Sequence, residues 1–186
     1  MEAGMSLVML VPLLPLLAAI IVLIGKPDTK HERARRVGVP AMVAAFLGSV
    51  VTLALVASQG PYIVRFYGPS SIINLALPFG FHIDRLSAVM MALISAVGAI
   101  VYRYSTNYMY QDRGYGRFLA LIGFNTFVLL CMVSSANLVM LFVFWQFLSY
   151  SLYLLAHNLH HAATLEGAFR TFTFLRVGDV AFLSGI

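Results

Sequence analysis

Six apolar segments, each close to twenty residues long, account for most of this 186-residue chain. They cover residues 5–25, 37–57, 85–109, 117–134, 137–156 and 167–186. An α-helix needs about 20 predominantly apolar residues to cross the hydrocarbon core of a bilayer. Only 10% of the residues are charged, whereas a water-soluble domain carries about 25%. The segments therefore predict an all-α integral membrane protein with about six transmembrane helices.

The first segment could be mistaken for an export signal. Its apolar run is twenty-one residues long, and Glu2 precedes it instead of a lysine or arginine. Signal peptides have a basic start and a shorter apolar core. We therefore expect residues 5–25 to be retained as the first membrane helix.

A long connection, residues 58–84, separates the second segment from the third. It contains two β-like runs, YIVRFY and LPFGFHI, with the turn-forming residues Gly68-Pro69-Ser70-Ser71 between them. This pattern predicts a small extramembrane β-hairpin between the second and third helices. The chain is thus expected to have two parts, residues 1–80 with two helices and the hairpin, and residues 81–186 with four helices.

The distribution of lysine and arginine predicts the orientation. Nine of the twelve basic residues lie on one side of the expected membrane, in the loops at 26–36 and 102–117 and at Arg170. The opposite side carries only Arg65 and Arg85. Basic loops stay in the cytoplasm, so the N-terminus is expected outside it. This topology explains the net charge of +5. We therefore expect the lipid bilayer to surround the protein and expect no nucleic-acid partner.

Polar side chains form a stripe on the fifth segment, whose sequence includes FVFWQFLSYSLYLLAHN. On a helix that turns about 100° per residue, Tyr150, Tyr153 and His157 fall within about 40° of Gln146. Ser149 lies at the edge of the same face. An unpartnered amide in hydrocarbon costs several kcal/mol, so this face must contact protein or water. The stripe is typical either of hydrogen bonds between helices or of a hydrated ion path, and the pattern leaves both open.

The sixth segment carries two charges within RTFTFLRVGDVAFLSGI, namely Arg176 and Asp179. Residues three apart on a helix are neighbours. Buried ions are tolerated when they pair with each other or line a pathway, and both interpretations remain possible here. Because the connection between the fifth and sixth segments is short, the two helices are expected to be antiparallel neighbours. Arg176 could then lie near the Gln146 stripe.

No metal or cofactor site is predicted. The sequence HNLHH contains His157, His160 and His161 at a helical spacing, but no cysteine or second carboxylate cluster supports a metal site. Histidines at the interface that exchange protons with water are the better interpretation. The chain also contains no phosphate-binding glycine loop, no CxxC and no nucleophile elbow. We therefore assign no catalytic residue.

The stretch from Phe81 to Ile186 resembles the antiporter-like membrane subunits of NADH-quinone oxidoreductase, of the chain L or subunit 5 type. The motifs that carry the resemblance are FHIDRLSAVM, YMYQDRGYGRFLALIGFNTFVLL, NLVMLFVFWQ and FRTFTFLRVGDVAFLSGI. Relatives include large subunits of multi-subunit sodium/proton antiporters and of membrane-bound hydrogenases. The first eighty residues fit these proteins only in hydropathy.

The resemblance implies a proton-translocating subunit that has no redox cofactor and works beside other membrane subunits in the inner (plasma) membrane of the cell. Any enzymatic role would be that of a non-redox subunit in an NADH:quinone oxidoreductase complex. Residues 81–186 would form the start of the antiporter-like domain. In the family, this domain continues with a helix that carries a lysine and with a second inverted repeat, and both are expected beyond the given sequence. The proton-path candidates are Gln146, Tyr150, Tyr153, His157, Arg176 and Asp179.

One departure from the family pattern concerns the residue after Trp145. The family has a glutamate at this position, whereas this chain has Gln146, which forms hydrogen bonds but cannot exchange a proton near neutral pH. The glutamine suggests a divergent branch, such as the membrane subunit of an inorganic carbon (bicarbonate/CO2) uptake complex related to chain L. A non-conducting membrane scaffold is a further alternative.

Overall fold

A computed structural model of the chain describes residues 2–24, 30–66, 79–111, 114–156 and 162–185. Six long helices make up most of the described residues: α1 (Glu2–Ile24), α3 (Val39–Gln59), α4 (Arg85–Tyr108), α5 (Tyr115–Val133), α6 (Leu138–Ala156) and α7 (Ala162–Ser184). A short helix, α2 (Lys30–Arg33), and a π-helical turn, η2 (Ala34–Gly38), lead directly into α3. Two strands, β1 (Tyr62–Phe66) and β2 (Phe79–Ile83), form an antiparallel sheet.

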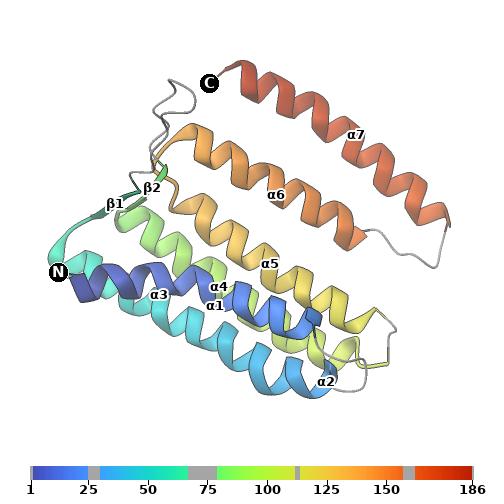
Figure 1. Cartoon of the computed structure of the whole chain (residues 1–186), viewed down its shortest axis with the longest axis horizontal. Helices are drawn as coiled ribbons and strands as arrows, with labels where there is room; N and C mark the ends of the chain where they lie inside the picture. Colours follow the sequence, from blue (N-terminus) through green and yellow to red (C-terminus); the bar gives the residue numbers. More distant parts are fainter. Residues whose placement is uncertain (1, 25–29, 67–78, 112–113, 157–161, 186) are drawn as a thin grey trace.

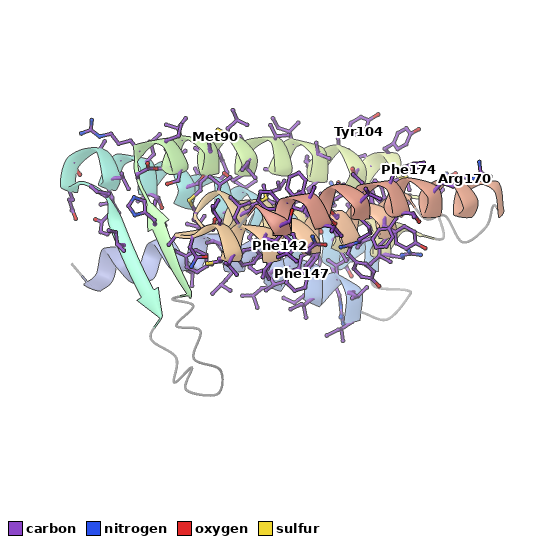
Figure 2. All side chains as sticks on the ribbon, turned by 90° about the horizontal axis from the view of Figure 1, so that it is seen from above. Met90, Tyr104, Phe142, Phe147, Arg170 and Phe174 are labelled. Atoms are coloured by element: carbon purple, nitrogen blue, oxygen red, sulfur yellow. The ribbon has the colours of Figure 1, made fainter. Side chains whose placement is uncertain are left out.

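The helices run up and down, so that consecutive long helices are antiparallel (Figure 1). Helices α1, α3, α4 and α5 pack together as a bundle, α6 packs on α5, and α7 packs on α6 at the edge (Figure 1). Many large apolar side chains point away from the bundle, including Met90 and Tyr104 of α4 (Figure 2). Such a surface suits lipid as solvent, because lipid does not penalise exposed apolar side chains.

The six expected helices and the hairpin are confirmed. Within the described parts of the chain, four helices are long and apolar enough to cross a membrane: Ala34–Gln59, Arg85–Tyr108, Tyr115–Val133 and Leu138–Leu155. The sixth helix starts at Ala162, five residues before the predicted start, because the segment AATLE is rich in strong helix formers. The predicted turn at Gly68-Pro69-Ser70-Ser71 lies outside the described residues.

Small residues allow α1 and α5 to approach closely. A Cβ added to Gly123 of α5 would lie 3.1 Å from the carbonyl oxygen of Pro15 and 3.2 Å from Cβ of Ala19, both on α1. Ala18 and Val22 are also buried on α1. Small residues at helix contacts let backbones approach closely inside membranes, where packing, rather than the hydrophobic effect, holds helices together.

The strand β2 connects the hairpin to the bundle. On one side it pairs with β1 from Tyr62↔Ile83 to Phe66↔Phe79. On the other side its main chain bonds to the α5–α6 connection, with His82 N donating to Ser134 O at 2.9 Å and Ala136 N donating to Gly80 O at 3.0 Å. The hairpin is therefore hydrogen-bonded on two sides of β2 and lies directly over the start of α6.

Asp84 caps the N-terminus of α4. Its Oδ1 accepts a 2.7 Å hydrogen bond from the backbone N–H of Ser87, and Ser87 Oγ accepts one of 2.8 Å from the backbone N–H of Asp84. This reciprocal arrangement is a capping box. The backbone N–H of Ser87 holds the pKa of Asp84 below its usual value, because a donated hydrogen bond favours the charged carboxylate.

Replacing Asp84 with alanine should destabilise the full-length protein by about 1 kcal/mol, the usual cost of losing an N-cap. Asp84→Asn should cost less, since asparagine is a good N-cap residue. Because the pKa of Asp84 is lowered on folding, its stabilising contribution is present at neutral pH and is lost as the pH falls through its folded value. Thermal unfolding in detergent as a function of pH measures all three effects. Equal loss from both variants would contradict the cap.

The turn η2 packs against a fully buried tyrosine of α4. A Cβ on Gly38 would collide with Oη of Tyr102 and lie 2.7 Å from its Cζ. Tyr102 is 0% exposed, and its hydroxyl has no hydrogen-bond partner among the described residues. The glycine thus makes room for the ring, whereas the hydroxyl contributes no hydrogen bond that offsets its burial.

Tyr102→Phe should therefore leave the full-length protein as stable as before, or more stable by up to about 1 kcal/mol, because removing an unsatisfied buried polar group is neutral or favourable. Unfolding of the purified protein in mixed micelles checks this expectation. A clear loss of stability would show that the hydroxyl has a partner.

Candidate functional site

The residues of interest lie at the contact between α6 and α7. Gln146 is the ninth of nineteen residues in α6, which places it near the middle of that helix. Helix α7 runs antiparallel beside α6 (Figure 1). The fifth and sixth predicted helices are therefore antiparallel neighbours, as expected. Their packing brings Arg176 and Asp179 of α7 to the level of Trp145 and Gln146 of α6.

Four side chains form a hydrogen-bonded network across this contact. Trp145 Nε1 donates to Asp179 Oδ1 at 3.0 Å. Arg176 Nη1 donates to Gln146 Oε1 and lies 3.1 Å from Asp179 Oδ2, at ion-pair distance. The guanidinium carbon of Arg176 also lies 4.4 Å from the centre of the Phe172 ring, within range of a cation–π interaction. Arg176 therefore has one anionic and two neutral partners.

Two atoms of the network have unused hydrogen-bonding capacity. Gln146 Nε2 and Asp179 Oδ2 are both buried and have no hydrogen-bond partner among the described residues, although Oδ2 lies at ion-pair distance from Arg176 Nη1. Asp179 is 7% exposed in total. Buried polar atoms of this kind usually bind ordered water or mark a functional site.

The stripe predicted on α6 is only partly brought together. Tyr153 packs on Phe172 of α7, with ring centres 5.0 Å apart, and Ser149 is buried. Tyr150 lies beside Tyr153 at 6.4 Å between ring centres, but it is 50% exposed, and no hydrogen bond between its side chain and the network is seen among the described residues. His157, like His160 and His161, lies outside the described residues.

Sequence reasoning missed a second polar contact, on the face of α6 towards α5. Ser151 is 0% exposed and donates to Oδ1 of Asn125. Arg117, at the start of α5, donates to the carbonyl oxygen of Leu154 at 2.9 Å. The signal for the first contact was an asparagine within the apolar run GFNTFVLL. Helix α6 thus has two polar faces, one towards α5 and one towards α7.

The arrangement holds a carboxylate, a guanidinium, an amide and an indole N–H together at mid-helix depth. Such groups are expensive in a membrane and mark ion paths, proton relays or structural pairs. Among the residues that the structure describes, no group of three or more His, Cys, Asp and Glu side chains is placed to bind a metal ion. The four side chains at the α6–α7 contact supply hydrogen-bond donors and acceptors and one ion pair.

Fold and site together define a multi-pass helical membrane protein with a polar network between two of its helices. A family model described as "NADH-Ubiquinone oxidoreductase (complex I), chain 5 N-terminus" matches residues 70–119. Subunit 5 of the chloroplast NAD(P)H-quinone oxidoreductase of Lemna minor is 32% identical over 100% of this chain and 26% of its own length. The corresponding protein of Chaetosphaeridium globosum is 34% identical over 95% of the chain and 28% of its own length.

A solved structure has the same fold. It is described as the membrane-bound sulfane sulfur reductase, an archaeal respiratory membrane complex, and one of its chains matches with a TM-score of 0.72 at 17% identity. The match covers 100% of this chain and 36% of that one. The chain is thus similar to membrane subunits of the chain 5 type, and the family model that it matches describes the N-terminus of those subunits. The chain spans about a quarter of the length of the plant and algal relatives it matches.

Proposed function

We propose that the chain forms part of a proton-translocating membrane subunit in an NADH-quinone oxidoreductase-like complex. In this proposal, H+ moves along the polar contact between α6 and α7. The observation that carries it is the partly buried network at mid-helix, where Arg176 joins Gln146 to the buried Asp179 and Trp145 donates to the same carboxylate. Tyr153 and His157 would continue the path along α6 towards the interface.

The positions of the basic residues support an inner (plasma) membrane orientation with the N-terminus outside the cytoplasm. The turn η2 with Arg35 and Arg36, the end of α4 with Arg103, and the starts of α5 and α7 all lie at the same end of the bundle (Figure 1). Arg170 lies near that end of α7 (Figure 2). Basic residues gather on the cytoplasmic side of membrane proteins. Other membrane subunits of the complex would cover part of the exposed apolar surface.

Proton flux through the full-length protein in vesicles tests the proposal. Gln146→Ala removes a hydrogen bond to a charged group, which contributes about 1.5–3 kcal/mol, and 1.36 kcal/mol corresponds to tenfold in rate. We therefore expect flux to fall about tenfold while the complex still assembles, and His157→Ala to reduce flux as well. Ser151→Ala is the matched control, because it removes a buried hydrogen bond on the other polar face of α6. Loss of assembly without a specific loss of flux would favour the scaffold function.

The glutamine itself favours a second candidate function. Because an amide cannot exchange a proton near neutral pH, Gln146 fits a divergent branch such as the membrane subunit of an inorganic carbon uptake complex. Growth that depends on this protein only at low CO2, together with an adjacent gene for a Cys/His-rich soluble protein, would support that function. Independence of growth from CO2 supply would count against it.

A further inference from the structure

The α6–α7 contact contains only one carboxylate among its described side chains, Asp179. The amide of Gln146 cannot take up or release a proton near neutral pH, and a guanidinium keeps its proton in proteins. A site that moves protons needs a group that changes its protonation state. Among the described side chains of this contact, the carboxyl group of Asp179 is the candidate.

The surroundings of Asp179 suit two protonation states. Oδ1 accepts a hydrogen bond from the indole N–H of Trp145 at 3.0 Å. It can accept this hydrogen bond whether or not Oδ2 carries a proton. Oδ2 is buried and receives no hydrogen bond from the described residues. A proton can therefore be added at Oδ2 without breaking a hydrogen bond, but the ion pair with Arg176 Nη1, 3.1 Å from the same oxygen, would be lost.

The surroundings of Arg176 explain how the site would tolerate a neutral Asp179. Protonation of the carboxyl group would remove the negative partner of the guanidinium, and an unpaired buried charge is costly. Arg176 would still donate to Gln146 Oε1 and lie over the Phe172 ring, and its side chain is 37% exposed. Gln146 is thus a neutral partner whose interaction with Arg176 does not depend on the charge of Asp179.

We propose that Asp179 is the proton-binding residue of this site and that Gln146 is a positioning residue, which holds Arg176 in place while Asp179 alternates between its charged and neutral forms. The inference rests on the proposed function, which it deepens by naming the group and the atom. The proton comes from water, forms an O–H bond at Oδ2, changes the carboxyl group from −1 to neutral, and returns to water on release. Gln146 Nε2, the other unpartnered buried atom, would donate to the water molecule that delivers it.

The other titratable and charged groups facing this contact are few. On α6 the titratable side chains within the described residues are Tyr150 and Tyr153, and on α7 the described charged side chains are Arg170, Arg176 and Asp179 itself. Arg170 lies nine residues before Asp179, more than two helical turns away at 3.6 residues per turn. If a carboxyl group at this contact binds a proton, replacing Asp179 alone should therefore abolish the signal among the described groups.

Infrared difference spectroscopy of the full-length protein in lipid vesicles tests the proposal. As the medium is made more acidic, we expect the carbonyl stretch of a protonated, buried carboxylic acid to appear. The band should be lost in Asp179→Asn. Asp84→Asn is the matched control, since it removes the helix-capping carboxylate while keeping a good N-cap residue, and it should retain the band. A band that persists in Asp179→Asn, or its absence from the wild type, would overturn the proposal.

The role of Gln146 has its own readout. In Gln146→Leu the guanidinium loses a neutral partner, so that a neutral Asp179 becomes less favourable and the band should require a more acidic medium to appear. Ser151→Ala, on the other polar face of α6, should leave the pH profile unchanged. An unchanged profile in Gln146→Leu would overturn the positioning role, because a merely structural contribution would alter stability without shifting this titration.

Comparison with proton flux separates this inference from the proposed function. If the band disappears in Asp179→Asn but flux continues at the wild-type rate, Asp179 binds a proton and conduction through this site is refuted. If flux stops in Gln146→Ala but the band persists in Asp179→Asn, the site conducts and the assignment to Asp179 is refuted. Loss of both the band and the flux in Asp179→Asn supports both.

Discussion

Replacing Arg176 with methionine should lower the free energy of unfolding of the full-length protein by about 3 kcal/mol, the lower end of the usual cost of removing one partner from a buried ion pair. The reason is that Asp179, 7% exposed, would lose its cationic partner and keep only the indole N–H of Trp145 as a donor. The lower end of the range applies because the Arg176 side chain is 37% exposed. Unfolding in mixed micelles measures the loss.

The double variant Arg176→Met/Asp179→Leu provides the control. Replacing both members of a buried pair with apolar residues is often neutral or stabilising, so most of the lost stability should return. Restored stability together with abolished proton flux would separate the energetic role of the pair from its function. If the double variant were less stable than Arg176→Met, the ion pair would not be the source of the effect.

Gly38→Ala should destabilise the protein by about 3 kcal/mol, the upper end of the cost of overpacking a core. The added methyl group would lie 2.7 and 2.8 Å from the ring atoms Cζ and Cε1 of Tyr102, and that ring is fully buried. Tyr102→Phe should relieve only part of the collision, because it removes the hydroxyl oxygen, the nearest atom, and leaves both ring atoms in place. Thermal unfolding of the single and double variants measures this effect.

Gly178→Ala is the matched control for the glycine. It makes the same substitution in α7, where a Cβ would meet no atom within 4 Å. Because alanine is favoured over glycine inside a helix by about 1 kcal/mol, this variant should be as stable as the wild type or more so. Equal destabilisation by both variants would mean that contact with Tyr102 is not the cause.

The helices were largely predictable because a bilayer imposes a strict length on apolar segments. Five of the six predicted segments agree with the helices to within about three residues at each end, a margin usual for helix boundaries. The turn η2 was not predicted, since Ala34–Gly38 carries no pattern that separates a π-helix from an α-helix. The close fit of Gly38 to Tyr102 depends on residues distant in sequence and could not be derived from either segment.

The site was predictable as a set of residues but not as a geometry. Helical periodicity placed Gln146 and Tyr153 on one face of α6, and both do lie towards α7. The same reasoning could not separate Tyr150, which is half exposed, because the rotation of α6 against α7 is set by packing. The contact of Ser151 with Asn125 was missed because it lies on the opposite face from the stripe.

The pairing of β2 with the α5–α6 connection fixes the position of the start of α6 relative to the hairpin. Main-chain hydrogen bonds from His82 to Ser134 and from Ala136 to Gly80 hold the start of α6 at the level of the hairpin. Trp145 and Gln146 therefore sit at a depth determined by the backbone. Outward-facing apolar side chains can therefore change during evolution without moving Trp145 and Gln146 along the bundle relative to the hairpin.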